Sequence, residues 1–301
     1  MSYPYVTDIL NAIFGTQWHV PIPVFGLVVV GAIYVAAFVA RGEVLRFARG
    51  RRLPESAHLV VSDLAIVTGI AGVVGARFFY LLDNPDQFLA DPMPMILSRS
   101  GFSIYGALFL GVLAGVAFLR KRSIPIRPML DAVAPSMMLG YAFGRLACQV
   151  VGDGDWGIAS DLALKPDWLP DWLWAQTYQG NILGVEITPP GVYPTPIYEC
   201  VAALVLFGVL WAFRRNPHRY GFSFSLYLLL AGFERLLIEK IRINTEHSVF
   251  GFSLTQAELV SVGIIVAGLI GILGTLRTRR LWTRITFSLC VLGALSACVP
   301  L

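Results

Sequence analysis

The chain has 301 residues, of which 56% are hydrophobic and only 14% are charged, and its formal net charge at pH 7 is +4. Because soluble domains carry about 25% charged residues, this composition indicates an integral membrane protein. The small net charge, without a Lys/Arg-rich run interleaved with aromatic residues, argues against a nucleic-acid-binding protein.

The first 21 residues precede the first long apolar stretch. They have no basic n-region and no suitably placed A-x-A-like cleavage site, so the sequence does not predict a signal peptide. We expect residues 1–21 to form an N-terminal interfacial arm that contains Trp18.

Apolar stretches long enough to cross a bilayer recur along the rest of the chain. A transmembrane helix needs about 20 predominantly apolar residues. We expect an all-α polytopic integral membrane protein with seven transmembrane helices, and with an eighth, shorter candidate in the C-terminal hydrophobic segment 285–301. The seven predicted spans within the body 22–284 are 22–40, 59–82, 101–119, 128–150, 196–213, 221–242 and 253–276.

The loops between these spans alternate in charge. Sixteen Lys and Arg residues lie in four alternate loops: 41–52, 120–127, 214–219 and 277–284. Only three lie in the intervening loops: 83–100, 151–195 and 242–252. The positive-inside rule therefore predicts an N-terminus outside the cell and a small extracytoplasmic head formed by 151–195.

Three arginines lie inside or at the rim of the apolar spans: Arg77, Arg145 and Arg235. A charge at the centre of a transmembrane helix costs about 2.5–3.5 kcal/mol on insertion scales, so such residues are usually paired or functional. The predicted topology brings all three to the outer side of the membrane, where they are expected to bind an anionic lipid head group.

Further polar residues are predicted at the same depth. We expect them to contribute to the same site as catalytic or substrate-binding groups: Ser103, Tyr105, Asp153, Tyr198, Glu199, Glu239 and Arg242. No metal is expected, because the four cysteines show no C-x-x-C spacing and no neighbouring His cluster. They are expected to be small buried hydrophobic residues.

Structural roles are alternatives for several of these residues. Arg235 and Glu239 are spaced four residues apart and can neutralise each other against lipid. Arg77 can extend its aliphatic stem to the interface. Interfacial or capping roles are the alternative for other polar residues: Tyr105, Tyr198, Lys240, Asp63 and Asp131.

The chain resembles the bacterial prolipoprotein diacylglyceryl transferases over roughly residues 60–276. The family's hallmark segment begins Gly-Arg and ends Trp-Gly, as residues 144–157 do here, with Arg145 as the signature arginine. Similar blocks occur in the family's order: Gly75-Ala76-Arg77-Phe78-Phe79-Tyr80, Ser103-Ile104-Tyr105-Gly106-Ala107-Leu108, Tyr193-Pro194-Thr195-Pro196-Ile197-Tyr198-Glu199 and Arg235-Leu236-Leu237-Ile238-Glu239, followed by Arg242, Gly251 and Gln256.

The resemblance implies transfer of a diacylglyceryl group from phosphatidylglycerol to the cysteine thiol of a prolipoprotein signal peptide, without metal or cofactor. It implies a site at the outer face of the bacterial inner membrane. Arg145 and Arg235 are expected to stabilise the phosphate, assisted by Arg77 or Arg242. The base that takes the thiol proton is expected among Asp153, Glu199 and Tyr105.

The chain also departs from the family pattern. Tyr105 stands where many members have His, and Cys148 stands where Asn is common. Gly-Asp-Gly-Asp replaces Asn-Gly-Glu, so either Asp153 or Asp155 can correspond to the family's glutamate. A divergent paralogue with another lipid donor or acceptor is therefore an alternative.

Two other classes of protein are alternatives. The G-x-G-D pattern at 152–155 is compatible with an intramembrane aspartyl protease, which would need a second carboxylate such as Asp83. A lipid or anion transporter is the non-enzymatic alternative, although the sequence shows no internal repeat and its charges gather at one face.

Overall fold

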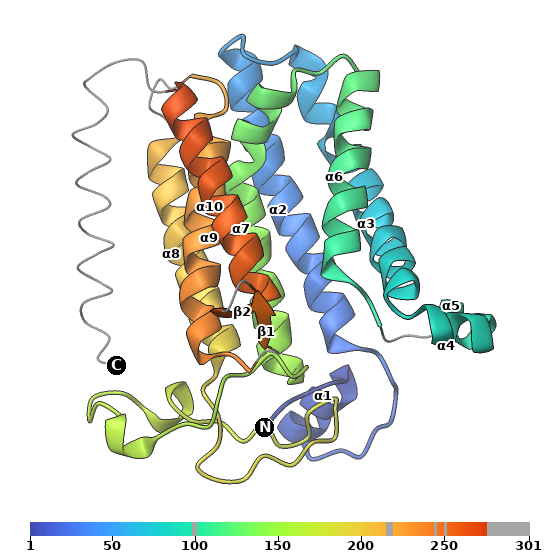
Figure 1. The fold of residues 1–301 in the computed structure, drawn as a ribbon, viewed down its shortest axis with the longest axis vertical. Coiled ribbons are helices and arrows are strands. Elements are labelled where there is room, and N and C mark those ends of the chain that lie inside the picture. Colours follow the sequence, from blue (N-terminus) through green and yellow to red (C-terminus); the bar gives the residue numbers. More distant parts are fainter. Residues whose placement is uncertain (98–100, 215–218, 244–245, 250–251, 276–301) are drawn as a thin grey trace.

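The computed structural model describes residues 1–97, 101–214, 219–243, 246–249 and 252–275, which form a bundle of long helices (Figure 1). Five helical segments are long and apolar enough to cross a membrane: Val24–Arg49, Glu55–Asp83, Ile104–Lys121, Thr195–Phe213 and Gln256–Thr275. Each coincides with one of the predicted spans. The chain is therefore a predominantly helical, multi-pass membrane protein. The predicted eighth span, 285–301, lies outside the described residues.

The described elements follow the predicted order. The α-helices are α1 (Val6–Phe14), α2 (Val24–Arg49), α3 (Val61–Asp83), α4 (Pro85–Ala90), α5 (Pro92–Leu97), α6 (Ile104–Lys121), α7 (Ile126–Val151), α8 (Thr195–Phe213), α9 (Phe222–Ile238) and α10 (Gln256–Thr275). Short 3-10 helices are η1 (Glu55–Val60), η2 (Leu162–Leu164), η3 (Asp171–Leu173) and η4 (Glu239–Ile241). An antiparallel hairpin pairs β1 (Glu246–Val249) with β2 (Phe252–Thr255).

The structure adds three local details to the predicted all-α architecture. A short antiparallel hairpin lies between α9 and α10. The predicted loop 83–100 contains α4 and α5, and α2 continues to Arg49 through most of the predicted loop 41–52. This extension is stabilised because the buried Glu43 forms ion pairs with Arg46 at 2.6 Å and with Arg214 of the chain after α8 at 2.9 Å.

Helices α7 and α9 run through the bundle beside α8 and α10 (Figure 1). Asp131 of α7 is buried and accepts hydrogen bonds from the backbone N–H groups of Gly221 (2.6 Å) and Phe224 (2.9 Å). These donors belong to the start of α9, where backbone N–H groups have no partner within the helix. Asp131 therefore has the capping role that the sequence allowed, and the helix that it caps is a neighbouring one.

The N-terminal arm and the head segment (residues 151–195) lie at the same end of the bundle (Figure 1). The backbone N–H groups of Ser2 and Tyr3 donate to Gln179 and Val150, each at 2.7 Å. Trp156 and Tyr178 pack in the head segment with ring centroids 5.1 Å apart. The turns that follow α2 and α6 lie at the opposite end.

Helices α3 and α6 cross at a pair of glycines. A Cβ atom on Gly75 would collide with the carbonyl oxygen of Gly106 and would lie 2.7 Å from the Leu110 Cβ. A Cβ atom on Gly106 would collide in turn with the carbonyl oxygen of Gly75. The absence of side chains at both positions lets the two backbones touch, as is common where helices pack in membranes.

This crossing predicts opposite effects for two glycines of α3. Gly75→Ala should lower the melting temperature in detergent, because overpacking a tight contact typically costs about 1–3 kcal/mol. Gly69→Ala is the matched control, since a Cβ there has no neighbour within 4 Å. Alanine is the better helix former by up to about 1 kcal/mol. Equal or higher stability of Gly75→Ala would contradict the close crossing.

Candidate functional site

The side chain of Glu199 lies at the centre of a group of charged residues near the head segment. Glu199 belongs to α8, and its relative exposure is 0%. Its carboxylate pairs with the Nε atom of Arg145 from α7 and with Nη1 of Arg242 at 3.1 Å. Nη1 of Arg235 from α9 lies 3.6 Å from the same carboxylate. Three guanidinium groups therefore share one fully buried acid.

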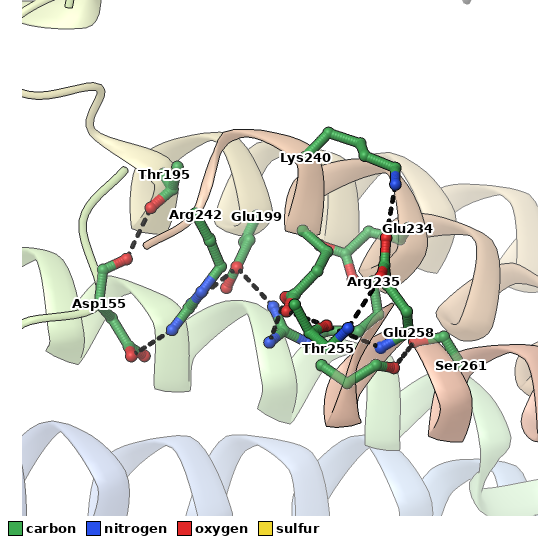
Figure 2. A network of polar contacts seen from close by, with 12 residues as sticks. Asp155, Thr195, Glu199, Glu234, Arg235, Lys240, Arg242, Thr255, Glu258 and Ser261 are labelled. Carbon is green, nitrogen blue, oxygen red and sulfur yellow. Dashed lines mark hydrogen bonds and ion pairs between the residues drawn. The ribbon is translucent and has the colours of Figure 1, made fainter. Parts of the chain in front are cut away.

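Two further carboxylates complete this ion-pair cluster. Asp155 of the head segment pairs with both Arg145 and Arg242, and Figure 2 shows Arg242 between Asp155 and Glu199. Glu239 pairs with Nη2 of Arg235 at 2.8 Å. The ion-pair cluster consists of Arg145, Asp155, Glu199, Arg235, Glu239 and Arg242.

The head segment is fixed against the residues that follow α9. Thr195 donates its hydroxyl to the Asp155 carbonyl oxygen at 2.6 Å, which orients the Asp155 loop. The backbone N–H of Ile158 donates to the carbonyl oxygen of Ile241 at 2.9 Å. A Cβ atom on Gly157 would lie 2.5 Å from that same oxygen, so the close approach requires glycine. Arg242 is thereby held over the loop that carries Asp155.

The start of α10 extends the polar network. The Thr255 hydroxyl donates to Glu239 at 2.6 Å, and the Glu258 carboxylate accepts from the Thr255 backbone N–H at 3.0 Å. Lys240 donates to Glu258 at 2.5 Å while 69% of its side chain stays exposed (Figure 2). Lys240 therefore points outward as expected, but it is also ion-paired.

A cleft of about 850 Å³ opens between α3 and α6 on one side and α10 on the other. Its lining is formed by Tyr80, Asp83, Phe102, Ser103, Ile104, Tyr105, Gln256, Leu259 and Val260. Thr255, which contacts the ion-pair cluster, directly precedes the cleft residue Gln256. The cleft lining therefore begins one residue along the chain from a side chain that contacts the ion-pair cluster.

The predicted site residues fall into separate groups. Arg145, Glu199, Arg235, Glu239 and Arg242 all belong to the ion-pair cluster. The predicted residues Ser103 and Tyr105 line the cleft instead. Their catalytic or binding roles stay predictions.

Two other predicted residues contact backbone. The Tyr198 hydroxyl donates to the carbonyl oxygen of Leu173 at 2.6 Å and so anchors the head segment. The Arg77 guanidinium donates to the carbonyl oxygens of Gly101 (2.7 Å), Ile96 (3.3 Å) and Met95. These described contacts of Arg77 position the chain between α5 and α6. The structure shows no contact between Arg77 and the ion-pair cluster among the described residues.

The predicted catalytic residue Asp153 lies beside Cys148 rather than among the arginines. The ligand-type atoms of Cys148, Asp153 and Asp155 all lie within 4.8 Å of one another. Because Asp155 already pairs with Arg145 and Arg242, a cation placed there would meet two guanidinium charges. This group is therefore a poor fit for a metal ion.

Asp155 is an ionised carboxylate rather than half of a proton-sharing pair. Burial alone would raise the pKa of the Asp155 carboxyl. The guanidinium groups of Arg242 and Arg145 outweigh this effect and hold the pKa below its ordinary range. An aspartyl protease needs two carboxyl groups that share one proton. The geometry around Asp155 therefore argues against the protease alternative.

Sequence reasoning missed several residues of this region. Asp155 was considered only as an alternative to Asp153. Tyr141, whose ring lies 5.1 Å from the Arg145 guanidinium carbon, was not selected, nor was the buried Glu234. The position of Glu234 directly before Arg235, inside an apolar span, was a usable signal for an intramembrane acid.

Comparison with known proteins gives a consistent match. A family model described as prolipoprotein diacylglyceryl transferase matches residues 12–274. A phosphatidylglycerol–prolipoprotein diacylglyceryl transferase of Corynebacterium efficiens is 32% identical over 262 residues, covering 83% of this chain and 76% of the relative. The equally named protein of Corynebacterium diphtheriae is 31% identical over 280 residues, covering 87% and 92%. That of Leptospira interrogans is 28% identical over 315 residues, covering 88% and 92%.

The central position of Glu199 predicts a large effect of Glu199→Gln on stability. Removing one partner of a buried ion pair costs about 3–5 kcal/mol, because the other charge stays buried without compensation. The melting temperature in detergent should fall clearly.

The control for this variant is Asp63→Asn. Asp63 lies 3.7 Å from Arg122, and both side chains are more than half exposed. Exposed pairs of this kind contribute about 0–1 kcal/mol. If both variants melted at the same temperature, Glu199 would not be the acid on which the cluster depends.

Proposed function

The chain belongs to the prolipoprotein diacylglyceryl transferase family, and we propose that it transfers a diacylglyceryl group from phosphatidylglycerol to the cysteine thiol of a prolipoprotein. The names of the relatives state this donor and this acceptor. The ion-pair cluster is the observation that carries the proposal, because three guanidinium groups gather at one end of a membrane-spanning bundle.

The reaction is a displacement at a glycerol carbon. The thiolate sulfur of the acceptor forms a bond to the carbon that bears the phosphate, and the carbon–oxygen bond breaks. Glycerol phosphate leaves with the bonding electron pair, and the thiol proton passes to a base. No atom is oxidised or reduced overall, so the proposed reaction requires no redox cofactor.

Arg145 and Arg235 are proposed to stabilise the charge of the leaving phosphate, with Arg242 assisting. Planar guanidinium groups bind phosphate oxygens through paired hydrogen bonds. Such donors stabilise a transition state more strongly where water is excluded. In the present structure these arginines pair with carboxylates, so a phosphate would replace carboxylate oxygens as their partner.

The base is proposed to be Asp153 or Tyr105. The carboxylate of Glu199 already faces three guanidinium groups, so its oxygens are occupied and not open to an approaching thiol. Asp153 lies in the head segment and Tyr105 lines the cleft, where an acceptor thiol has room to approach. Glu199 is therefore assigned to positioning the arginines.

The phosphatidylglycerol donor is proposed to reach the arginines sideways from the bilayer through the cleft. Leu259 and Val260 offer an apolar wall for acyl chains, while Ser103, Tyr105 and Asp83 offer polar groups for the head group. Lateral access lets the lipid tails stay in the membrane during binding. Arg77, beside Tyr80 of the cleft, is proposed to stabilise this wall.

The proposed topology has seven spans, with α7 and α9 in addition to the five long apolar segments. The N-terminus and the head segment face outward from a bacterial inner membrane. The sequence supports this through its sixteen basic residues in alternate loops. The fold is in keeping with it, because the N-terminal arm and the head segment lie at one end of the bundle and the turns after α2 and α6 lie at the other (Figure 1).

The proposed roles of the arginines predict severe losses in transfer. Arg145→Ala and Arg235→Ala should each lower kcat by about 100-fold or more, as removal of a transition-state hydrogen-bond donor does. Arg145→Lys and Arg235→Lys should each retain only part of the transfer activity, because lysine keeps the positive charge but lacks the planar guanidinium group. The measurement is the mass increase of a cysteine-containing signal peptide incubated with phosphatidylglycerol vesicles.

Arg122→Ala is the control, since Arg122 directly follows α6, far along the bundle from the head segment, and more than half of its side chain is exposed. Complementation of a strain lacking the transferase gives the same comparison in cells. Full activity of both alanine variants would remove these arginines from the mechanism. Lipid movement across proteoliposomes without peptide modification would favour the transporter instead.

A further inference from the structure

Glu234 is a buried acid beside the ion-pair cluster that the proposed mechanism does not use. It belongs to α9, directly before Arg235, and its relative exposure is 8%. Its Oε2 atom lies 3.3 Å from the Tyr141 hydroxyl. Its Oε1 atom is buried without a hydrogen-bond partner among the described residues. An ionised carboxylate with an unsatisfied buried oxygen is strongly unfavourable, whereas a neutral acid is less so.

The hydroxyl of Tyr141 lies between two acids. It is 3.3 Å from Oε2 of Glu199 and 3.3 Å from Oε2 of Glu234. A hydroxyl carries one hydrogen and accepts through its lone pairs, so Tyr141 can donate to only one of them. The Tyr141 hydrogen is assigned to Glu199, because the three arginines already contact that carboxylate. The second contact becomes a hydrogen bond if Glu234 carries a proton and donates it to the Tyr141 oxygen.

The charges of the cluster lead to the same assignment. Three guanidinium groups are matched by three carboxylates: Asp155, Glu199 and Glu239. An ionised Glu234 would add a fourth negative charge and leave the region with a net charge of the same sign as a phosphate. The titratable groups that face Glu234 are Glu199 of α8, Arg145 and Tyr141 of α7, and Arg235 and Tyr227 of α9.

We propose that Glu234 is a protonated carboxylic acid, hydrogen-bonded to Tyr141, that keeps the cluster neutral and thereby sets its affinity for an anionic phosphodiester head group. Glu234 is a positioning and specificity-determining residue, since it acts through Tyr141 and the arginines. The inference rests on the proposed function for the identity of the ligand. When the pH rises and Glu234 ionises, the fourth negative charge repels the phosphate.

The pH dependence of the donor KM tests this inference. If only the protonated form binds the lipid well, the KM for phosphatidylglycerol rises by up to about tenfold per pH unit once Glu234 ionises. Glu234→Gln places a neutral donor at the same position, so its donor KM should stay nearly constant from about pH 6 to about pH 9. The acceptor thiol, whose ordinary pKa is about 8.5, also ionises in this pH range. Its contribution is measured separately, as the pH dependence of kcat at saturating peptide.

Asp63→Asn is the matched control, because it makes the same carboxyl-to-amide replacement at an exposed residue, which pairs with Arg122 directly after α6. In Asp63→Asn the donor KM should rise with pH as it does in the wild-type protein. The inference is overturned if the donor KM of Glu234→Gln rises equally with pH, or if that of the wild-type protein does not change with pH.

Infrared spectroscopy provides a second measurement that does not depend on activity. At neutral pH the wild-type protein should show a protonated-carboxyl band that is missing from Glu234→Gln, with both proteins monodisperse in gel filtration. Identical spectra in this region overturn the inference. Failure of the wild-type protein to modify the peptide would instead count against the proposed function, while the infrared result would still decide the protonation of Glu234.

Discussion

One fully buried carboxylate, shared by three guanidinium groups, determines how this protein is assembled at one end of its bundle. Glu199 comes from α8, Arg145 from α7, Arg235 from α9, and Arg242 from the chain after η4. A charge in such a low-dielectric region is tolerated only when it is paired. The helices and the head segment must therefore pack together before any of these side chains reaches a favourable environment.

The same pairing bears on the proposed binding of an anionic lipid. The arginines are held in place by carboxylates, so little reorganisation is needed when a phosphate takes over some of their hydrogen bonds. In the proposed route the lipid enters through the cleft, where Leu259 and Val260 provide apolar surface. The close crossing of α3 and α6 at Gly75 and Gly106 builds one wall of that cleft. The helices α3 and α6 that pack closely in the membrane therefore also line the proposed lipid entrance.

The sequence predicted the long apolar helices because a run of about 20 apolar residues has few alternatives to spanning a bilayer. It drew attention to Arg145 and Arg235, which the structure brings together at Glu199, because intramembrane charges are rare and costly. Their functional roles stay predictions. The sequence predicted the Arg235–Glu239 pair from its four-residue spacing. It did not predict most ion pairs between residues far apart in the chain, since those depend on tertiary contacts. Glu43, for example, is buried in the extension of α2 because it meets Arg214, 171 positions away in the chain. Likewise, Asp155 rather than Asp153 reaches the arginines because the Asp155 loop is fixed by contacts with the start of α8.

The most direct test of this account is an experimental structure with phosphatidylglycerol bound. The account predicts that the lipid phosphate lies within hydrogen-bonding distance of the Arg145 and Arg235 guanidinium groups, with the acyl chains leaving through the cleft between α6 and α10. A phosphate bound elsewhere, with both arginines still paired to Glu199 and Asp155 or Glu239, would contradict it.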